Sequence, residues 1–238
     1  METRLKRVIG LADACELLCS VFRYPTPALA EGMSDGRIHI DAVACLVDAG
    51  VNQEKAEGMC EGVAALRGGD IVEVLEGMRR VYSFLYVRQG SGVAIFPYES
   101  PFLHTMSGRG GVPVLFRSVA TLDVENSMRA VGVLPSDSRT EPCDSIWEEF
   151  EFASFLLGSL ASALVDKNEN ECEKWETALR TFNAKHIQKW LPCFFSTSND
   201  VLDALHTDGS VSDESYSLYK GLFAYAQTVV NLVNTEAE

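Results

Sequence analysis

The sequence predicts an all-helical fold, a single-domain bundle of about eight to ten helices. Apolar residues recur at steps of three and four along most of the chain, the spacing at which side chains share one face of a helix. No series of alternating polar and apolar residues predicts a sheet. With 238 residues, of which 47% are hydrophobic, the chain is long enough to bury a substantial core.

Three helical segments are expected in the first part of the chain. The first, residues 5–22, carries an apolar stripe and ends before Pro25, because a proline disfavours helical geometry in the residue that precedes it. The second, residues 41–66, is interrupted near Gly50 and therefore forms one or two short helices. The third, residues 70–87, keeps its apolar stripe until a glycine-rich stretch stops it.

Two connections stand out. Residues 88–113 are expected to form one long loop, because its glycines and prolines lie too close together for a helix interior. A loop of that length in a compact domain usually has a function. Residues 131–145 contain a turn and are a candidate hinge.

Four further helices are expected at residues 114–131, 145–165, 171–190 and about 213–233. The second of these has the most regular apolar stripe and should be central. The third should end at Pro192, which cannot donate a helical hydrogen bond. The last begins near Ser212 or Asp213, both of which are suitable N-caps.

The charge balance excludes some partners. The chain has 34 acidic and 20 basic residues, a net charge of -14, which disfavours binding to nucleic acid or to anionic membranes. Its most apolar stretch, residues 152–165, is interrupted by serines and is shorter than the roughly 20 residues that cross a bilayer. We therefore expect no stable membrane insertion and a cytoplasmic location.

The cysteines predict neither disulfides nor a metal site. Their number is odd, seven, and no Cys-x-x-Cys pair is present, so reduced thiols in the cytosol are expected. Cys15 and Cys19 share a helix face, but no histidine or further cysteine follows at the spacing of a zinc site. We expect buried thiols, no metal and no cofactor.

No motif of an enzyme is evident. The glycines at 90–92 and 108–111 lack the order of a phosphate-binding loop. His104 with Asp144 is the one candidate acid–base pair, against the simpler interpretation that His104 is a hydrogen-bonded loop residue. His186 is interpreted as a core histidine. We expect no catalytic residue, and two alternatives stay open: a small nucleotide-dependent enzyme or switch, and a dimerising scaffold.

The segment after the first glycine loop has the composition of a binding edge. It places Phe96, Phe102 and Leu103 around the carboxylate of Glu99. Carboxylates accept guanidinium groups in a bidentate manner, and aromatic faces add cation–π stabilisation. Glu99, Glu141 and Asp144, with Tyr98 and Trp147 as aromatic faces, therefore suit a peptide that contains arginine.

Three blocks of sequence resemble the TorD/DmsD family of redox-enzyme maturation chaperones. In the first, Tyr82, Leu85 and Tyr86 match an aromatic-x-x-Leu-aromatic signature, and residues 97–100 match a proline-aromatic-x-serine turn. In the second, residues 141–152 resemble a Glu-Pro-x-Asp-His segment and the acidic, aromatic helix after it. In the third, residues 186–194 resemble a His, Trp-x-Pro, Phe helix end. The histidine that follows the aspartate in the family is Ser145 here.

The resemblance implies a noncatalytic chaperone, monomeric or homodimeric. It implies binding to the twin-arginine signal peptide of an apo molybdoenzyme of the dimethyl sulfoxide or trimethylamine N-oxide reductase type. It also allows contact with the body of that enzyme until the molybdopterin cofactor is inserted before export. The residues expected to contact the peptide are Tyr82, Tyr86, Phe96, Pro97, Tyr98, Glu99, Ser100, Phe102, His104, Glu141, Asp144, Ser145 and Trp147.

Overall fold

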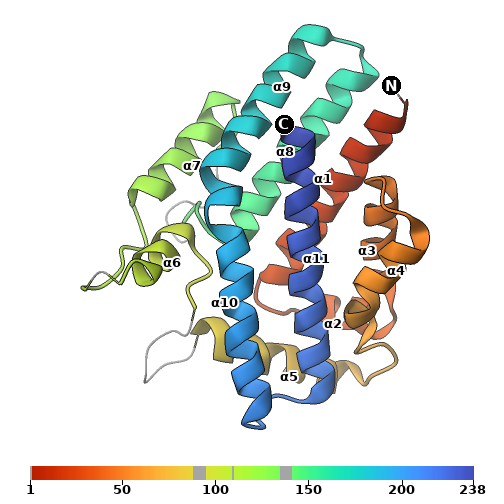
Figure 1. Ribbon diagram of the computed structural model, residues 1–238, viewed down its shortest axis with the longest axis vertical. Coiled ribbons are helices and arrows are strands. Elements are labelled where there is room, and N and C mark those ends of the chain that lie inside the picture. Colours follow the sequence, from red (N-terminus) through yellow and green to blue (C-terminus); the bar gives the residue numbers. More distant parts are fainter. Residues whose placement is uncertain (1, 88–94, 109, 135–140) are drawn as a thin grey trace.

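The computed structural model describes residues 2–87, 95–108, 110–134 and 141–238 (Figure 1). The described helices are α1 (Glu2–Phe22), α2 (Pro27–Ser34), α3 (Arg37–Asp48), α4 (Gln53–Cys60), α5 (Ile71–Tyr82), α6 (Glu99–Met106), α7 (Val119–Ala130), α8 (Ile146–Val165), α9 (Glu169–Phe182), α10 (Gln188–Thr207) and α11 (Asp213–Ala237). A 3-10 segment, η1 (Glu61–Ala64), and two π-helical segments, η2 (Ser83–Val87) and η3 (Asn183–Ile187), complete them. The predicted all-helical fold class is confirmed.

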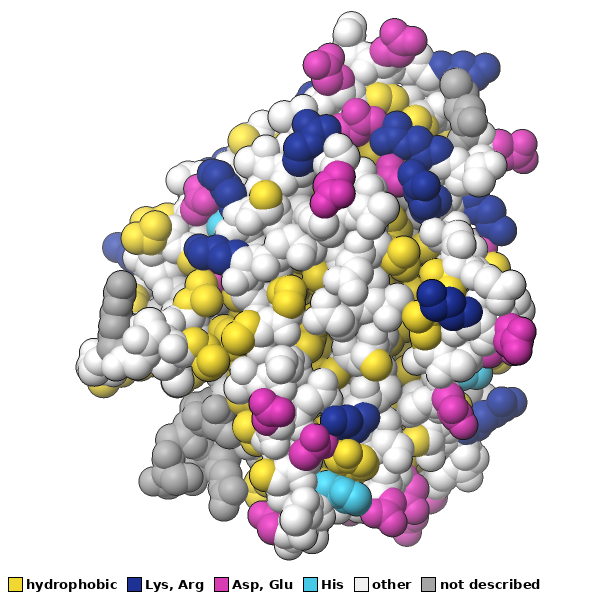
Figure 2. All heavy atoms as spheres, in the orientation of Figure 1, with side chains coloured by type: hydrophobic (Ala, Val, Ile, Leu, Met, Phe, Trp, Pro, Cys, Tyr) yellow, Lys and Arg dark blue, Asp and Glu magenta, His cyan; other side chains and the backbone are white. Residues whose placement is uncertain are grey.

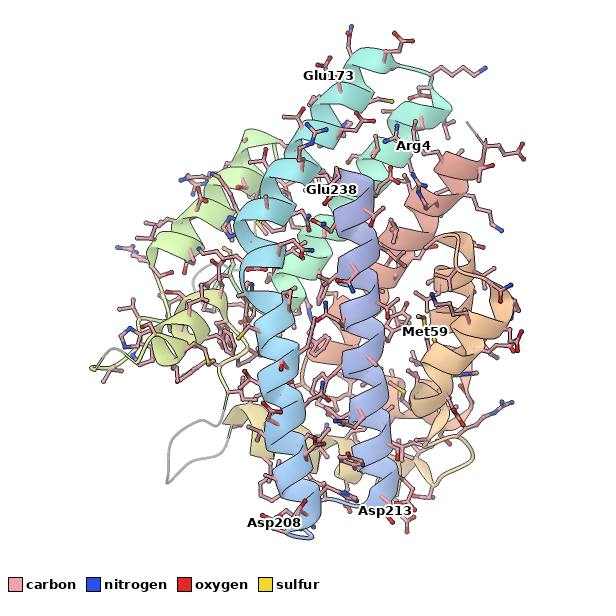
Figure 3. The ribbon with its side chains drawn as sticks, in the orientation of Figure 1. Arg4, Met59, Glu173, Asp208, Asp213 and Glu238 are labelled. Carbon is pink, nitrogen blue, oxygen red and sulfur yellow. The ribbon has the colours of Figure 1, made fainter. Side chains whose placement is uncertain are left out.

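The long helices form the centre of the molecule. In Figure 1, α10 and α11 run side by side, and α1 and α8 pack behind them. Figure 3 shows the short connection between Asp208 and Asp213 that reverses the chain from α10 into α11. α9 continues the direction of α10 through η3, while α6 and α7 lie together at one side (Figure 1). None of the described helices combines the length and apolar character that crossing a bilayer requires.

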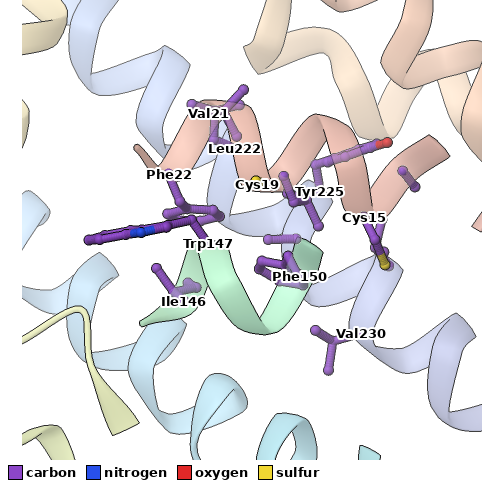
Figure 4. Close-up of a cluster of buried hydrophobic side chains, with 14 of the residues drawn as sticks. Cys15, Cys19, Val21, Phe22, Ile146, Trp147, Phe150, Leu222, Tyr225 and Val230 are labelled. Atoms are coloured by element: carbon purple, nitrogen blue, oxygen red, sulfur yellow. The ribbon is translucent and has the colours of Figure 1, made fainter. Parts of the chain in front are cut away.

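Aromatic rings fill the core where α1, α8 and α11 meet. Figure 4 shows Phe22 of α1 beside Trp147 and Phe150 of α8, with Leu222 of α11 close by. The ring of Phe22 stacks on that of Phe150, with centroids 6.1 Å apart, and on that of Phe223, at 6.2 Å. Such offset pairs add stability beyond the burial of their area. Residues from both ends of the chain thus share one core.

Side-chain caps explain where many of the helices begin. Seven described helices start after a residue whose side-chain oxygen accepts an N–H of the first turn: Thr26, Asn52, Asp70, Ser118, Ser145, Asn168 and Ser212. Because the first N–H groups of a helix have no internal partner, each cap satisfies one of them. The predicted cap Ser212 is confirmed.

The prediction of one long loop at residues 88–113 is wrong for the middle of that range, which contains the helix α6. α6 begins at Glu99, and Pro101 is its third residue. A proline is tolerated in the first turn because the N–H that it lacks would have no helical partner there. Of the rest of that loop, residues 88–94 and 109 lie outside the described residues, as do residues 135–140 of the candidate hinge.

The predicted helix end at Pro192 is also wrong. Pro192 lies inside α10, four residues after its first residue, Gln188. The π-helical turn η3 directly precedes α10, so the hydrogen-bond register changes just before the position where the proline lacks its N–H. The helix therefore continues beyond the proline to Thr207.

Two glycines allow η1 to approach α11 closely. A Cβ atom on Gly221 would lie 2.6 Å from the carbonyl carbon of Gly62 and 2.8 Å from the backbone nitrogen of Val63. These are backbone atoms, so the clash is not relieved by turning a side chain. The contact requires glycine at position 221.

We expect Gly221→Ala to lower the free energy of unfolding by about 2 kcal/mol, measured by urea denaturation. Alanine alone would favour a helix by about 1 kcal/mol over glycine, so the steric clash must outweigh this gain. The matched control is Gly158→Ala in α8, where no described atom lies within 4 Å of the added Cβ. That variant should be as stable as the parent or more so. Equal stabilities for both variants would contradict the close contact.

Candidate functional site

The first and second signature blocks are joined through their backbones. The N–H of Glu99 donates to the carbonyl of Asp144 at 2.8 Å, and the N–H of Ile146 donates to the carbonyl of Pro97 at 3.0 Å. We call this pairing of Pro97, Glu99, Asp144 and Ile146 the clasp. It ties the start of α6 to the start of α8, because Glu99 and Ile146 are the first residues of those helices.

Asp144 caps α6 from a distance in sequence. Its Oδ2 accepts the backbone N–H of Ser100 at 3.1 Å, and its Oδ1 accepts the hydroxyl of Thr121 at 3.1 Å. The N-cap residue of α6, Tyr98, has no side-chain cap bond of its own. Asp144 is fully buried, and this burial raises its carboxyl pKa while the two hydrogen bonds oppose the rise. Its polar atoms serve the fold.

Ser145 is the N-cap of α8. Its hydroxyl accepts the N–H of Glu148 at 3.3 Å, and its backbone forms an isolated antiparallel bridge with Tyr98. Serine is among the best N-cap residues. The departure from the family histidine at this position therefore has a structural role.

The third signature block meets Glu99 from the other side. Glu99 is fully buried, and its Oε2 lies 2.7 Å from Nδ1 of His186 in η3. Its Oε1 accepts a hydrogen bond from Nζ of Lys189 in α10, also at 2.7 Å. The interpretation of His186 as a core histidine is confirmed, since it is 1% exposed and its Nδ1 contacts a carboxylate, whereas its Nε2 has no hydrogen-bond partner in the described chain.

Glu149 adds a second buried carboxylate beside Glu99. Its Oε2 accepts the indole N–H of Trp190 at 2.9 Å, while its Oε1 has no hydrogen-bond partner in the described part of the chain. Burial, and then the neighbouring carboxylate of Glu99, raise the pKa of Glu149 well above its ordinary value. We call Glu99, Glu149, His186, Lys189 and Trp190 the buried network.

Sequence reasoning left four members of the buried network out of the predicted site. His186, Lys189 and Trp190 follow one another at steps of three and one, so they lie on one side of the chain where η3 passes into α10. π-helical turns are rare and occur often at functional sites. The sequence contained a signal for these residues. His186 and Lys189 are polar residues beside Trp190 in a mostly apolar stripe, and Glu149 is a charged residue in the apolar stripe of α8.

A second group joins four predicted residues, of which Tyr82 and Trp147 are buried, to the exposed Tyr24, which was not among the residues predicted from the sequence. Tyr24 is 50% exposed and packs edge-on against Tyr82, with ring centroids 5.3 Å apart. Tyr98 packs edge-on against Trp147 at 5.5 Å. Glu141 lies near these rings, since its charge contributes, after burial, to the raised pKa of the Tyr82 and Tyr98 hydroxyls. We call Tyr24, Tyr82, Tyr98, Glu141 and Trp147 the aromatic–acidic surface.

Glu141 is the predicted carboxylate with an oxygen that is unpartnered within the described chain, and that oxygen is buried. It is half-buried, and its Oε1 has no hydrogen-bond partner among the described residues. Burial raises the pKa of its carboxyl, while a hydrogen bond with Tyr98 and the charge of Arg23 oppose the rise. Arg23 itself pairs with Glu148 at 3.1 Å and with Glu151 at 2.7 Å. This part of the surface therefore has three carboxylates close to one arginine.

The predicted site residues do not form one groove. Tyr86 and Phe102 are 6% and 2% exposed and belong to the core, and Phe96 is half-buried. The structure brings Glu99 and Asp144 together, but with internal partners rather than as open acceptors. Burial of a polar group requires such partners, and the sequence alone does not show it.

His104 lies beside the buried network instead. It lines a cavity of about 390 Å³ together with Glu99, Asp123, His186 and Lys189. Asp144 is committed to α6 and Thr121, so the candidate pair of His104 with Asp144 gains no support from these contacts.

The comparisons with known proteins identify a family. The family model described as nitrate reductase delta subunit matches residues 52–196, more than half of the chain and all three signature blocks. Neither the curated proteins nor the solved structures gave a match. The resemblance to the TorD-like chaperones is confirmed by this match. The chain belongs to the nitrate reductase delta subunit family.

Proposed function

We propose that this protein is a noncatalytic cytoplasmic chaperone that binds the twin-arginine signal peptide of an apo molybdoenzyme. The family match supports the general role, maturation of a molybdoenzyme. The client is proposed to be a reductase of the dimethyl sulfoxide or trimethylamine N-oxide type, held until its molybdopterin cofactor is inserted before export. The chaperone acts as a monomer or a homodimer.

The half-buried carboxylate of Glu141 is the observation that carries the proposal. Its Oε1 lacks a hydrogen-bond partner within the described chain, although an unsatisfied carboxylate oxygen is costly away from water. A guanidinium group provides the donors that would satisfy it, and the ring of Tyr98 offers a face for the same cation. The ring of Tyr24 already has the guanidinium group of Arg79 over it, 5.1 Å from the ring centroid. The proposal therefore places one peptide arginine at Glu141.

The surroundings of Arg23 support a site for the second peptide arginine. Arg23 pairs with Glu148 and Glu151, and its own side chain is 47% exposed. Exposed ion pairs contribute little stability, so a peptide arginine can replace or join Arg23 at low cost. The region thus accepts guanidinium groups already.

The apolar part of the peptide needs a surface that differs from the one predicted. Phe102 is excluded because it is 2% exposed, whereas Tyr24 and the half-buried Phe96 remain accessible. On the face drawn in Figure 2, hydrophobic side chains reach the surface over α6 and the adjoining part of α10. We place the apolar stretch of the peptide along Tyr24 and Phe96.

Isothermal titration with synthetic twin-arginine leaders tests the proposal. We expect saturable binding that is lost when both arginines are changed to alanine. Glu141→Gln should weaken binding about tenfold, because the amide cannot accept a charge-assisted pair. The control is Glu173→Gln on α9, an exposed glutamate labelled in Figure 3, which should bind like the parent. Binding that ignores the arginines or Glu141 would refute the proposed contact.

Leader binding should weaken as the pH falls. Only the ionised carboxylate of Glu141 attracts an arginine, and burial raises its pKa, so protonation begins at a higher pH than for an ordinary glutamate. Arg23, Tyr82, Tyr98, Asp144 and Glu148 are the charged and titratable groups around it. We expect the affinity for the leader, measured by titration calorimetry, to be lower at pH 5 than at pH 7.

Titration of the Glu141→Gln variant over the same range provides the control. Its affinity should depend less on pH than that of the parent, because arginine keeps its charge throughout. Parallel pH profiles for the two proteins would show that Glu141 does not control the dependence.

A further inference from the structure

The buried network contains three donor atoms that face one another. They belong to Glu99, Glu149 and His186, from α6, α8 and η3. One such atom from each residue lies within 4.8 Å of the others, and all three side chains are buried. Two carboxylates and one imidazole are donors that divalent transition metals, zinc among them, accept in proteins.

The outer oxygen of each carboxylate has a partner of its own. Lys189 donates to Oε1 of Glu99 at 2.7 Å, and Trp190 donates to Oε2 of Glu149 at 2.9 Å. These bonds fix the orientation of both carboxylates. The other oxygen of Glu99 contacts Nδ1 of His186, and the other oxygen of Glu149 has no hydrogen-bond partner among the described residues. Carboxylates that bind metals are held in this way by surrounding hydrogen bonds.

The outer nitrogen of the histidine lies near a carboxylate. Nε2 of His186 is 3.3 Å from Oδ2 of Asp123 in α7 but forms no hydrogen bond with it in the described part of the chain. For Nδ1 to bind a metal, the proton that it shares with Glu99 must leave, and a proton on Nε2 could then donate to Asp123 after a small rotation of the ring. Histidines that bind metals almost always direct their other nitrogen at a carboxylate, a carbonyl or a water.

An independent observation points to a missing ligand. Oε1 of Glu149 belongs to a side chain that is 0% exposed, and it has no hydrogen-bond partner among the residues that the structure describes. Buried polar atoms are nearly always paired, and an exception calls for a specific explanation such as a bound ion. A cation coordinated by this oxygen provides that explanation.

We propose that Glu99, Glu149 and His186 bind one Zn²⁺ ion. Zinc takes carboxylate oxygen and imidazole nitrogen at about 2.0–2.2 Å, so ligand atoms in a tetrahedral site are roughly 3.4 Å apart. Side-chain rotations would have to separate Oε2 of Glu99 from Nδ1 of His186, which are 2.7 Å apart, to reach that spacing. The ion neutralises the charge of the two carboxylates, which Lys189 alone does not.

The cavity beside the buried network gives the ion an entry path. Glu99 and His186 line this cavity of about 390 Å³, together with Asp123 and Lys189. Three protein ligands leave a coordination position for water, which the cavity supplies. Because the ligands come from α6, α8 and η3, the ion would hold the clasp and the start of α10 together. This inference does not depend on leader binding.

Zinc titration of the chelator-treated full chain tests the proposal. The experiments use a Cys193→Ser background, since Cys193 is the exposed thiol and thiolates bind zinc themselves. We expect one Zn²⁺ per chain and a melting temperature that rises with zinc, because a ligand selective for the native state stabilises it. Glu149→Gln should weaken zinc binding by about 100-fold or more, since an amide is a poor ligand for zinc.

Two further variants control for misfolding. Glu151→Gln changes an exposed glutamate of the same helix and should bind zinc like the parent. Asp123→Asn changes the carboxylate nearest to Nε2 of His186. Asp123 is 41% exposed, so the change should leave the fold intact, but it should weaken zinc binding by about 10- to 100-fold. Absence of zinc binding by the parent, or equal affinity in all variants, would overturn the proposal.

Discussion

Replacing Asp144 with alanine should lower the free energy of unfolding by about 3 kcal/mol, one of the two largest effects that we expect. The substitution removes the acceptor of two donors, the N–H of Ser100 and the hydroxyl of Thr121. Both donors lie in poorly solvated positions, so each would keep its desolvation cost without a partner. The start of α6 would lose its cap and the clasp would weaken.

Urea denaturation of Asp144→Ala, with the denaturant slope compared with that of the parent, measures this loss. Thr121→Val removes one of the two donors and should cost about 1 kcal/mol. Asp200→Ala, at an exposed aspartate of α10, should leave the midpoint unchanged. A loss for Asp144→Ala no larger than that for Asp200→Ala would show that the carboxylate does not support the clasp.

Replacing Trp190 with alanine should cost about 4 kcal/mol of unfolding free energy. The indole is fully buried, with Phe194 at 5.2 Å and Phe102 at 5.7 Å between ring centroids. The substitution leaves a cavity in this aromatic packing. It also removes the N–H that Glu149 accepts, so both oxygens of a buried carboxyl would lack a partner.

Two variants separate the packing of Trp190 from its hydrogen bond. Trp190→Phe keeps an aromatic ring and removes the N–H, and should cost less than Trp190→Ala, about 2 kcal/mol. Trp175→Ala changes a partly exposed indole on α9 and should cost least of the three. Urea midpoints in any other order would contradict the assignment of Trp190 to the buried network.

The helices that the sequence predicts well are those whose signals are local. α8 has an apolar stripe, and its cap, Ser145, directly precedes it. α6 could not be predicted in this way, because it is short, contains Pro101 and is capped by Asp144, which lies 44 residues beyond Ser100. Helix propensities and local capping patterns cannot predict a cap that comes from a residue distant in the sequence.

The candidate site shows the same division between local and tertiary signals. The order of the three blocks indicates the family, but not which of their carboxylates are buried. Glu99 and Glu141 lie in similar sequence contexts, each next to a proline or a tyrosine. Yet Glu99 is fully buried between His186 and Lys189, whereas Glu141 is half-buried and has an unpartnered oxygen. Only tertiary packing distinguishes them.

This division affects how the signature residues are interpreted. Asp144 and Ser145 cap helices, and Glu99 joins α6 to α10 through Lys189. These residues therefore hold the fold together, and we propose that recognition of the client depends on the less regular positions around Glu141 and Tyr24. Substitutions there should change leader affinity and leave stability nearly constant.

A double-mutant cycle tests the central claim, that Glu141 binds an arginine of the leader. Titration calorimetry would compare the parent and Glu141→Gln, each with the native leader and with leaders in which one arginine is alanine. If the two groups pair, the effects of the changes are not additive, and we expect a coupling of about 1.5 kcal/mol for one arginine. Additive effects for both arginines would contradict the claim.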